Sequence, residues 1–304
     1  MRRTIITAIA ALSAVACIWG CTSAVIGRRA SASGRPMLWK HRDTGAKGNF
    51  VATVSSVGPG EHAYTGLFND IDTACLECWT GMNDAGFAIM NTASYNLAPD
   101  TATLRDREGA VMTLALRRCR TVADFAAMLD TLPRPMGIQA NFGVIDAEGG
   151  AAFFEADDHG YTPFYIGMHE GDPDAMVRTN FSVCGNDSTG KGYVRFQNAC
   201  HLLGISDSLG NFRAAESERR YAPDDFLQAS RSYYTARLGR VATPADTAVW
   251  GVDQMFIPRR SSRASLVIEG IGQNSTDTSM TMWALLGFPP EAPLTTYKLP
   301  LKQK

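Results

Sequence analysis

The chain has 304 residues, of which 45% are hydrophobic and 19% charged, and its formal net charge is -1. This composition is ordinary for globular proteins and supplies enough apolar side chains for a sizeable core. A nearly neutral chain lacks the basic surface that nucleic acids require, so we expect no nucleic-acid partner.

The first 20 residues have the three parts of a secretory leader. Arg2 and Arg3 give it a positive start, an apolar run covers residues 5–18, and Gly20 is the small residue that precedes Cys21. The apolar run is shorter than the roughly 18–20 residues that span a bilayer. An N-terminal anchor that is never cleaved is the alternative interpretation.

We therefore expect residues 1–20 to be a signal peptide and residues 21–304 to form one domain. No later segment is long and apolar enough for a transmembrane span, and no Pro/Gly-rich linker divides the chain. Export would place the protein in the periplasm or outside the cell, where disulfides are permitted. The six cysteines that remain after cleavage are too thinly spread for a disulfide scaffold.

The chain then alternates between blocks of strands and blocks of helices. Residues 22–92 contain short apolar runs separated by turn residues, which is typical of successive strands. The apolar spacing over residues 108–132 predicts two helices broken near Thr121, which would act as an N-cap.

Strands resume over residues 141–167, where Ala-Glu-Gly-Gly indicates a hairpin turn. Residues 192–204 and 224–239 read as helices, and residues 263–272 and 279–288 as two further strands. Segregated blocks of this kind predict an α+β fold with layered, largely antiparallel sheets.

Cys21 would carry both a thiol and a free α-amino group if the leader is removed before it. The amine has an ordinary pKa of about 8 and the thiol of about 8.5, so the amine can accept the thiol proton near neutral pH. No histidine base is then required. Two other interpretations are a buried, inert thiol and a lipid-bearing cysteine, since Ile-Trp-Gly-Cys is similar to a bacterial lipoprotein cleavage site. Trp19 is bulky for that site, and no polar tether follows.

The stretch CTSAVIGRRASASGRPMLWKHRDT resembles the start of the N-terminal nucleophile (Ntn) amidohydrolases. The similar group contains choloylglycine hydrolases, penicillin V acylases and acyl-CoA:6-aminopenicillanate acyltransferases. Further segments resemble motifs of that group in the same order, and they are MNDAGFAIMN (82–91), NFGVIDAEGGAAFFE (141–155), VRTNF (177–181), GYVRFQNACHLL (192–203) and TMWALLGFPPEAP (281–293). The resemblance implies a four-layer αββα sandwich of two antiparallel sheets between helices.

The resemblance also implies a catalytic role for residues near the start of the mature chain. Cys21 would be the nucleophile, and Asp43 would hold its α-amino group. Lys40 aligns with an arginine that steadies the thiolate, with Arg42 as a competitor. In a regular strand Lys40 and Asp43 face opposite sides, so a bulge or a strand end is needed there.

Three residues further along the chain are implied by the same resemblance. Asn91 would donate to the oxyanion, with Tyr95 and Asn96 as rivals because the register is open. Asn180 would contact the nucleophile or the substrate, and Arg195 would complete the polar site. A turn asparagine and an exposed helical arginine are the structural alternatives for Asn180 and Arg195.

These residues lead to the prediction of an exported cysteine hydrolase that cleaves linear, non-peptide N-acyl amide bonds in small molecules. No metal or organic cofactor is implied, because one residue supplies both nucleophile and base. Acyl transfer to an amine, a dipeptidase activity and a lipid-anchored, non-catalytic binding protein are the alternatives. We expect a signal peptidase to expose Cys21, and the sequence leaves homo-oligomer formation open.

Overall fold

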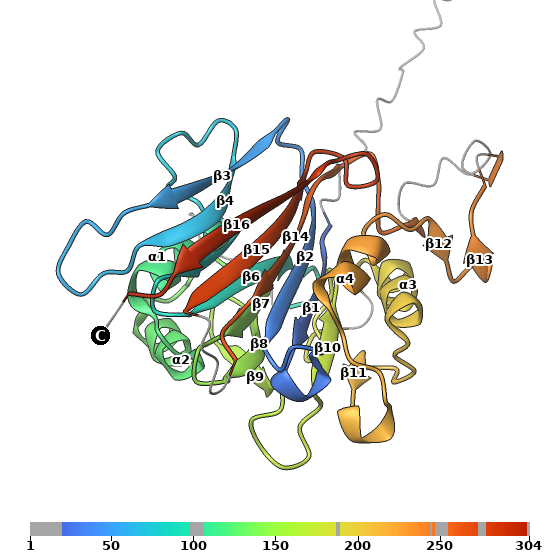
Figure 1. Cartoon of the computed structure of the whole chain (residues 1–304), viewed down its shortest axis with the longest axis horizontal. Helices are drawn as coiled ribbons and strands as arrows, with labels where there is room; N and C mark the ends of the chain where they lie inside the picture. Colours follow the sequence, from blue (N-terminus) through green and yellow to red (C-terminus); the bar gives the residue numbers. More distant parts are fainter. Residues whose placement is uncertain are drawn as a thin grey trace, which may run out of the picture.

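Two seven-stranded sheets lie face to face in the computed structural model (Figure 1). The structure describes residues 20–97, 106–186, 189–243, 245–246, 255–272 and 278–302. The expected leader therefore lies outside the described residues, apart from Gly20. Within the described residues, no helix combines the length and the apolar character needed to cross a membrane.

The first sheet has the strand order β11-β10-β1-β2-β14-β15-β16, and every pair in it is antiparallel. Its strands are β1 (Thr22–Ile26), β2 (Met37–Asp43), β10 (Ala175–Arg178), β11 (Asn211–Phe212), β14 (Ser262–Glu269), β15 (Ser279–Leu286) and β16 (Leu294–Pro300). The strand that begins next to Cys21 is thus in the interior of the sheet, between β10 and β2.

The second sheet follows chain order from β3 to β9 and is also antiparallel throughout. Its strands are β3 (Asn49–Val54), β4 (Tyr64–Asn69), β5 (Thr80–Asn83), β6 (Ala88–Ala93), β7 (Ala140–Ile145), β8 (Ala151–Ala156) and β9 (Tyr161–Tyr165). A short hairpin of β12 (Tyr234–Thr235) and β13 (Arg240–Val241) stands apart from both sheets.

Helices cover the outer face of each sheet, and three apolar clusters separate the four layers. Helices α1 (Glu108–Arg118) and α2 (Val122–Thr131) pack on the second sheet, and α3 (Tyr193–Leu203) and α4 (Pro223–Ala229) pack on the first. The third cluster fills the space between the two sheets. Figure 1 shows the two helix pairs on opposite sides of the molecule. The predicted α+β sandwich of two antiparallel sheets between helices is confirmed.

Several local predictions are confirmed by the backbone. Thr121 does separate α1 from α2, and its side chain accepts from the Asp124 amide at 3.1 Å in a capping box. The turn at residues 147–150 joins β7 to β8 as a hairpin. The expected helix at 192–204 is α3.

Two predictions near the C-terminal end need correction. The expected helix over residues 224–239 ends at Ala229, where the Ser230 hydroxyl donates to the Phe226 carbonyl at 2.7 Å and accepts from Trp39 Nε1 at 3.0 Å. Side-chain bonds of this kind compete with continued helix formation. A third C-terminal strand, β16, follows the two that were predicted, and its mostly exposed, polar pattern is that of a sheet edge.

Candidate active site

A cavity of about 1090 Å³ opens beside the start of β1. Cys21, Lys40, Asp43 and Asn91 all line it. Cavities that bind small molecules have volumes of roughly 300–1,000 Å³, so this one has room for a small organic substrate. The cavity therefore gathers four of the six predicted site residues.

The pairing of β1 with β2 explains why these residues meet. Thr22 lies opposite His41 and Ser23 opposite Lys40, a register that places Cys21 beside Arg42. Since both strands are interior to the sheet, their ends are held on two sides. The residue before β1 is thus fixed next to the last residues of β2.

The remaining two predicted residues reach Cys21 through hydrogen bonds. Arg195, at the start of α3, donates from Nη1 to the Cys21 carbonyl at 2.5 Å and to Thr22 Oγ1 at 3.1 Å. Its Nη2 donates to Asn180 Oδ1 at 2.6 Å. Asn180 Nδ2 in turn donates to the Ala93 carbonyl at 2.7 Å. Both side chains are buried, so the interpretation of Arg195 as an exposed helical residue is wrong.

Asp43 is held by two residues that the sequence analysis missed. Arg259 donates to Asp43 Oδ2 from Nε at 3.0 Å and from Nη2 at 2.6 Å, and the Ser262 hydroxyl donates to Oδ1 at 2.5 Å. The same Nη2 of Arg259 donates to the Gly20 carbonyl at 2.8 Å. Asp43 and the Gly20–Cys21 peptide bond therefore share one guanidinium group.

Lys40 and Asn91 come from opposite sheets and touch inside the cavity. Lys40 Nζ donates to Asn91 Oδ1 and to the Trp79 carbonyl, both at 2.6 Å. Desolvation by burial lowers the pKa of Lys40 to about 8, although attraction to Cys21 opposes the shift. Among the described residues no acceptor binds Asn91 Nδ2, so the amide can donate to a substrate oxygen in the cavity.

A regular strand would place Lys40 and Asp43 on opposite faces, but the end of β2 is irregular. Asp43 is the last residue of the strand and pairs with Ser262, whereas Arg42 pairs with Ala264. The extra residue on β14, Arg263, makes a bulge at this point, which re-aims neighbouring side chains. Lys40, Arg42 and Asp43 consequently all line the cavity.

The two rivals of Asn91 are separated by their positions. Tyr95 also lines the cavity. Asn96 faces a second pocket and is bound to Ser182, whose amide donates to Asn96 Oδ1 at 2.7 Å. Tyr95 thus remains a candidate oxyanion donor beside Asn91, and Asn96 does not.

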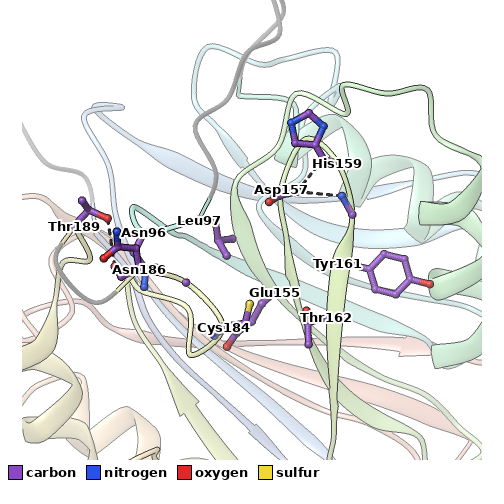
Figure 2. A pocket seen from close by; sticks show the side chains of 12 residues that line it. Asn96, Leu97, Glu155, Asp157, His159, Tyr161, Thr162, Cys184, Asn186 and Thr189 are labelled. Atoms are coloured by element: carbon purple, nitrogen blue, oxygen red, sulfur yellow. Dashed lines mark hydrogen bonds between the residues drawn. The ribbon is translucent and has the colours of Figure 1, made fainter.

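The second pocket has a volume of about 750 Å³ and contains Cys184 (Figure 2). Figure 2 shows the Cys184 sulfur next to Glu155 and Thr162. Burial and the nearby Glu155 carboxylate raise the pKa of the Cys184 thiol to about 12. A thiol with so high a pKa holds its proton near neutral pH and is a poor nucleophile.

Other cysteines outside the cavity are no better suited to attack a carbonyl. Burial raises the pKa of Cys78, Cys119 and Cys200 to about 12 in each case. Burial also raises the pKa of Cys75. In the part of the chain that the structure describes, Cys21 is the cysteine that lines the larger cavity, and no disulfide forms.

Among the described residues, no histidine lines this cavity. His41 lies behind it, with Nε2 2.8 Å from the Ser262 hydroxyl and 3.7 Å from Asp43 Oδ1. Burial lowers the pKa of His41 to about 4, so the ring is neutral at pH 7. Over the described ranges, no group of three or more His, Cys, Asp or Glu side chains is arranged to hold a metal ion.

No known family profile matches the sequence, and no curated protein matches it either. Solved structures do match, with 13% identity and a TM-score of 0.53 to the N-acylethanolamine-hydrolyzing acid amidase ortholog of Caenorhabditis elegans, covering 92% of this chain and 100% of that chain. At this identity the similarity establishes a shared fold.

Penicillin V acylase from Agrobacterium tumefaciens is similar over 92% of this chain and 86% of its own, with 13% identity and a TM-score of 0.47. A mutant of conjugated bile acid hydrolase from Clostridium perfringens is similar over 93% and 99%, with 10% identity and a TM-score of 0.40. With TM-scores below 0.5, these two similarities carry no further conclusion.

Proposed function

We propose that the chain is an exported Ntn-type amidohydrolase that cleaves linear, non-peptide N-acyl amides through an acyl-enzyme on Cys21. Removal of residues 1–20 as a signal peptide would expose the Cys21 amine at the start of a domain that comprises residues 21–304. The C. elegans protein with a similar fold is named as a hydrolase of N-acylethanolamines, which are amides of this class.

One observation carries the proposal: the peptide bond before Cys21 lies within the cluster that surrounds Asp43. The Gly20 carbonyl accepts from Arg259 Nη2 at 2.8 Å, and that nitrogen also binds Asp43 at 2.6 Å. The Cys21 nitrogen is bonded to the carbon of that carbonyl, and cleavage of this bond turns the nitrogen into the free α-amine. The free amine would therefore lie near the buried Asp43 carboxylate, which would hold it in position beside the Cys21 thiol.

In the first half of the reaction, the Cys21 amine takes the thiol proton and Sγ attacks the substrate carbonyl carbon. The oxyanion that forms would accept from Asn91 Nδ2, whose Oδ1 is held by Lys40 at 2.6 Å. A donor at that position contributes roughly 3 kcal/mol to transition-state stabilisation. The protonated amine then gives its proton to the leaving nitrogen as the C–N bond breaks, which leaves a thioester.

In the second half, the same amine removes a proton from water, and the water oxygen attacks the thioester carbonyl. Collapse of the second tetrahedral intermediate releases the carboxylic acid, and the proton returns to the sulfur. An amine in place of water would give acyl transfer with the same residues. The distinction depends on which acceptor reaches the thioester.

A lipid anchor on Cys21 is disfavoured by the local structure. β1 begins at Thr22, directly after the cysteine, so there is no tether between a modified sulfur and the sheet. The Cys21 carbonyl is also fixed by Arg195 at 2.5 Å. A diacylglycerol group on this sulfur would have to occupy the cavity itself.

Mass spectrometry of the exported protein tests the proposal most directly. We expect a chain that begins at unmodified Cys21, takes up one equivalent of a thiol-reactive amide analogue there, and loses N-acyl amide hydrolysis in Cys21→Ala with its circular dichroism spectrum unchanged. Full activity in Cys21→Ala would exclude the nucleophile. A mass increase of one diacylglycerol group on Cys21 would instead support the anchored binding protein.

A further inference from the structure

Two buried cations of β2, Lys40 and Arg42, line the cavity without a carboxylate partner. Both side chains are at most 3% exposed. Alternation along the strand places them on one face, and both border the same space as Cys21. We propose that Arg42, supported by Lys40, is an anion subsite that binds a carboxylate of the substrate, an inference that rests on the proposed function.

The partners of Arg42 are all neutral. Its Nη2 donates to Asn69 Oδ1 at 2.8 Å, and its Nη1 donates to Asn49 Oδ1. Its guanidinium lies 4.9 Å from the centre of the Trp79 ring, which is the geometry of a cation–π contact. These contacts orient the group, and they use two of its five N–H donors. No carboxylate within the described residues forms an ion pair with it.

Two other buried cations of the described chain are paired with carboxylates, whereas buried Arg195 binds the neutral oxygens of Cys21, Thr22 and Asn180. Arg178, at 1% exposure, binds Glu155 at 2.8 Å, and Arg259, at 2% exposure, binds Asp43 at 2.6 Å. Burying a charge without a counter-ion is costly. Unlike Arg195, Arg42 lines the cavity, where a ligand could supply the missing negative charge.

The carboxylates of the cavity wall cannot serve as that counter-ion. Asp43 already binds Arg259 and Ser262. Glu77 and Asp106 are exposed at the rim, where water and salt screen their charges. The wall therefore combines a buried positive inner part with exposed negative side chains.

The Cys21 thiolate is the rival partner for these cations. Burial lowers the pKa of Arg42 to about 10, and attraction to Cys21 is the largest effect that opposes this shift. One thiolate carries a single negative charge, and after cleavage its own α-amino group lies next to it. It therefore cannot neutralise both Lys40 and Arg42. If Arg42 served only to pair with the thiolate, replacing Arg42 would affect charged and uncharged substrates equally. An anion subsite would instead affect only substrates that carry a carboxylate.

A carboxylate suits this position because guanidinium groups bind it through two parallel N–H···O bonds. Trp79 and Tyr95 provide apolar surface in the same cavity. The substrate class that fits is an amide with an apolar part and one carboxylate a few bonds from the scissile carbonyl. That carboxylate could belong to either the acyl part or the amine part.

Binding to the purified Cys21→Ala chain separates these cases without requiring turnover. One probe pair is phenylacetylglycine and phenylacetylglycinamide, with the carboxylate on the amine side. The other is glutaric acid monoanilide and its primary carboxamide, with the carboxylate on the acyl side. We expect the acid of one pair to bind at least about tenfold tighter than its carboxamide by titration calorimetry, and the pair that shows this identifies the side.

Arg42→Gln in the same background should abolish the preference for the acid while leaving carboxamide binding unchanged, which also shows that the variant is folded. Arg42→Lys should keep part of the preference, and Lys191→Gln, at an exposed cation of the same cavity, should keep all of it. Equal binding of acid and carboxamide in both pairs, or no binding of any probe at millimolar concentration, would overturn the subsite. Selective acid binding with no hydrolysis by the unsubstituted enzyme would instead count against the proposed function alone.

Discussion

Lys40 Nζ donates a 2.6 Å hydrogen bond to Asn91 Oδ1, so a lysine on the first sheet fixes the direction of an amide on the second. An ammonium group can only donate, and the amide oxygen must therefore face Lys40. The amide nitrogen is left toward the cavity. The orientation of the candidate oxyanion donor thus depends on a residue that need not touch the substrate.

Replacing Lys40 should reduce turnover more than substrate binding. In Lys40→Met the amide of Asn91 loses its fixed orientation, and we expect kcat to fall about 10²-fold or more with KM changed less than about threefold. Lys40→Arg keeps a donor and a charge and should retain most of the activity. Steady-state kinetics on one uncharged N-acyl amide, which does not use the proposed anion subsite, measure both effects, and an increase in KM alone would show that Lys40 serves binding instead.

The rate should also depend on pH through Lys40. Its pKa is lowered by burial to about 8, and the titratable groups around it are Cys21, Arg42, Cys78 and Glu108. We expect kcat/KM to rise as the Cys21 amine loses its proton near pH 8 and to fall again as Lys40 becomes neutral. Lys40→Arg should remove the alkaline fall, because a guanidinium stays protonated. An unchanged alkaline fall in that variant would assign it to another group.

Above about pH 8, where activity should fall, the Lys40 contribution to the free energy of unfolding should rise. The folded pKa of Lys40, about 8, lies below its ordinary value of 10.5. Between those pH values the unfolded chain binds more protons than the folded chain, so the Lys40 contribution to the free energy of unfolding rises with pH. Urea unfolding at pH 7 and pH 10 should show a larger gain for the unsubstituted chain than for Lys40→Met. Equal gains would mean that Lys40 is not desolvated.

The Asp43–Arg259 pair should matter for folding as well as for catalysis. Both side chains are buried, and Arg259→Met leaves the Asp43 carboxylate without its main partner. Loss of one member of such a pair typically costs about 3–5 kcal/mol. Arg219→Met, which breaks a half-exposed pair with Asp225 at 3.2 Å, is the matched control and should cost less than about 1 kcal/mol. Denaturant unfolding measures both, and similar costs would contradict a buried, strongly coupled pair.

Local sequence signals were sufficient for the parts of the fold that depend on neighbouring residues. Thr121 predicted the break between α1 and α2 because its hydroxyl caps the following helix within the same short segment. The apolar period over residues 192–204 likewise predicted α3. β16 was missed because an edge strand with an exposed, polar surface has little of the alternation that marks a half-buried strand.

The candidate site shows the same limit. Cys21 and Asp43 were proposed from a leader boundary and a motif, whereas Arg259 and Ser262 lie in a run of arginine and serine with no distinguishing pattern. Only the pairing of β14 with β2, which sets Ser262 opposite Asp43, gives them a place in the site. Long-range register of this kind is not encoded in a short motif, so a single sequence cannot reveal it.

Gly20 provides a test of how the mature N-terminus is made. A Cβ on residue 20 would lie 2.5 Å from Asn180 Oδ1, 2.6 Å from Arg195 Nη2 and 2.7 Å from Arg259 Nη2. In the folded precursor a methyl group there would displace the hydrogen-bonded ends of these three side chains, whereas signal peptidases accept small residues such as alanine. If a peptidase cuts the chain during export, as we expect, Gly20→Ala should be secreted at full mature length and begin at Cys21.

Intact mass and immunoblotting of precursor and mature forms would measure this, with Cys21→Ala as the companion variant. Peptidase cleavage requires neither the thiol nor the folded site, so both variants should be processed like the unsubstituted chain. Accumulation of uncut precursor in both would mean that the folded chain cuts itself, with Cys21 as the nucleophile. Accumulation in Gly20→Ala alone would mean that a separate protease cuts the chain after it has folded. The added methyl group would then slow that cleavage by displacing residue 20.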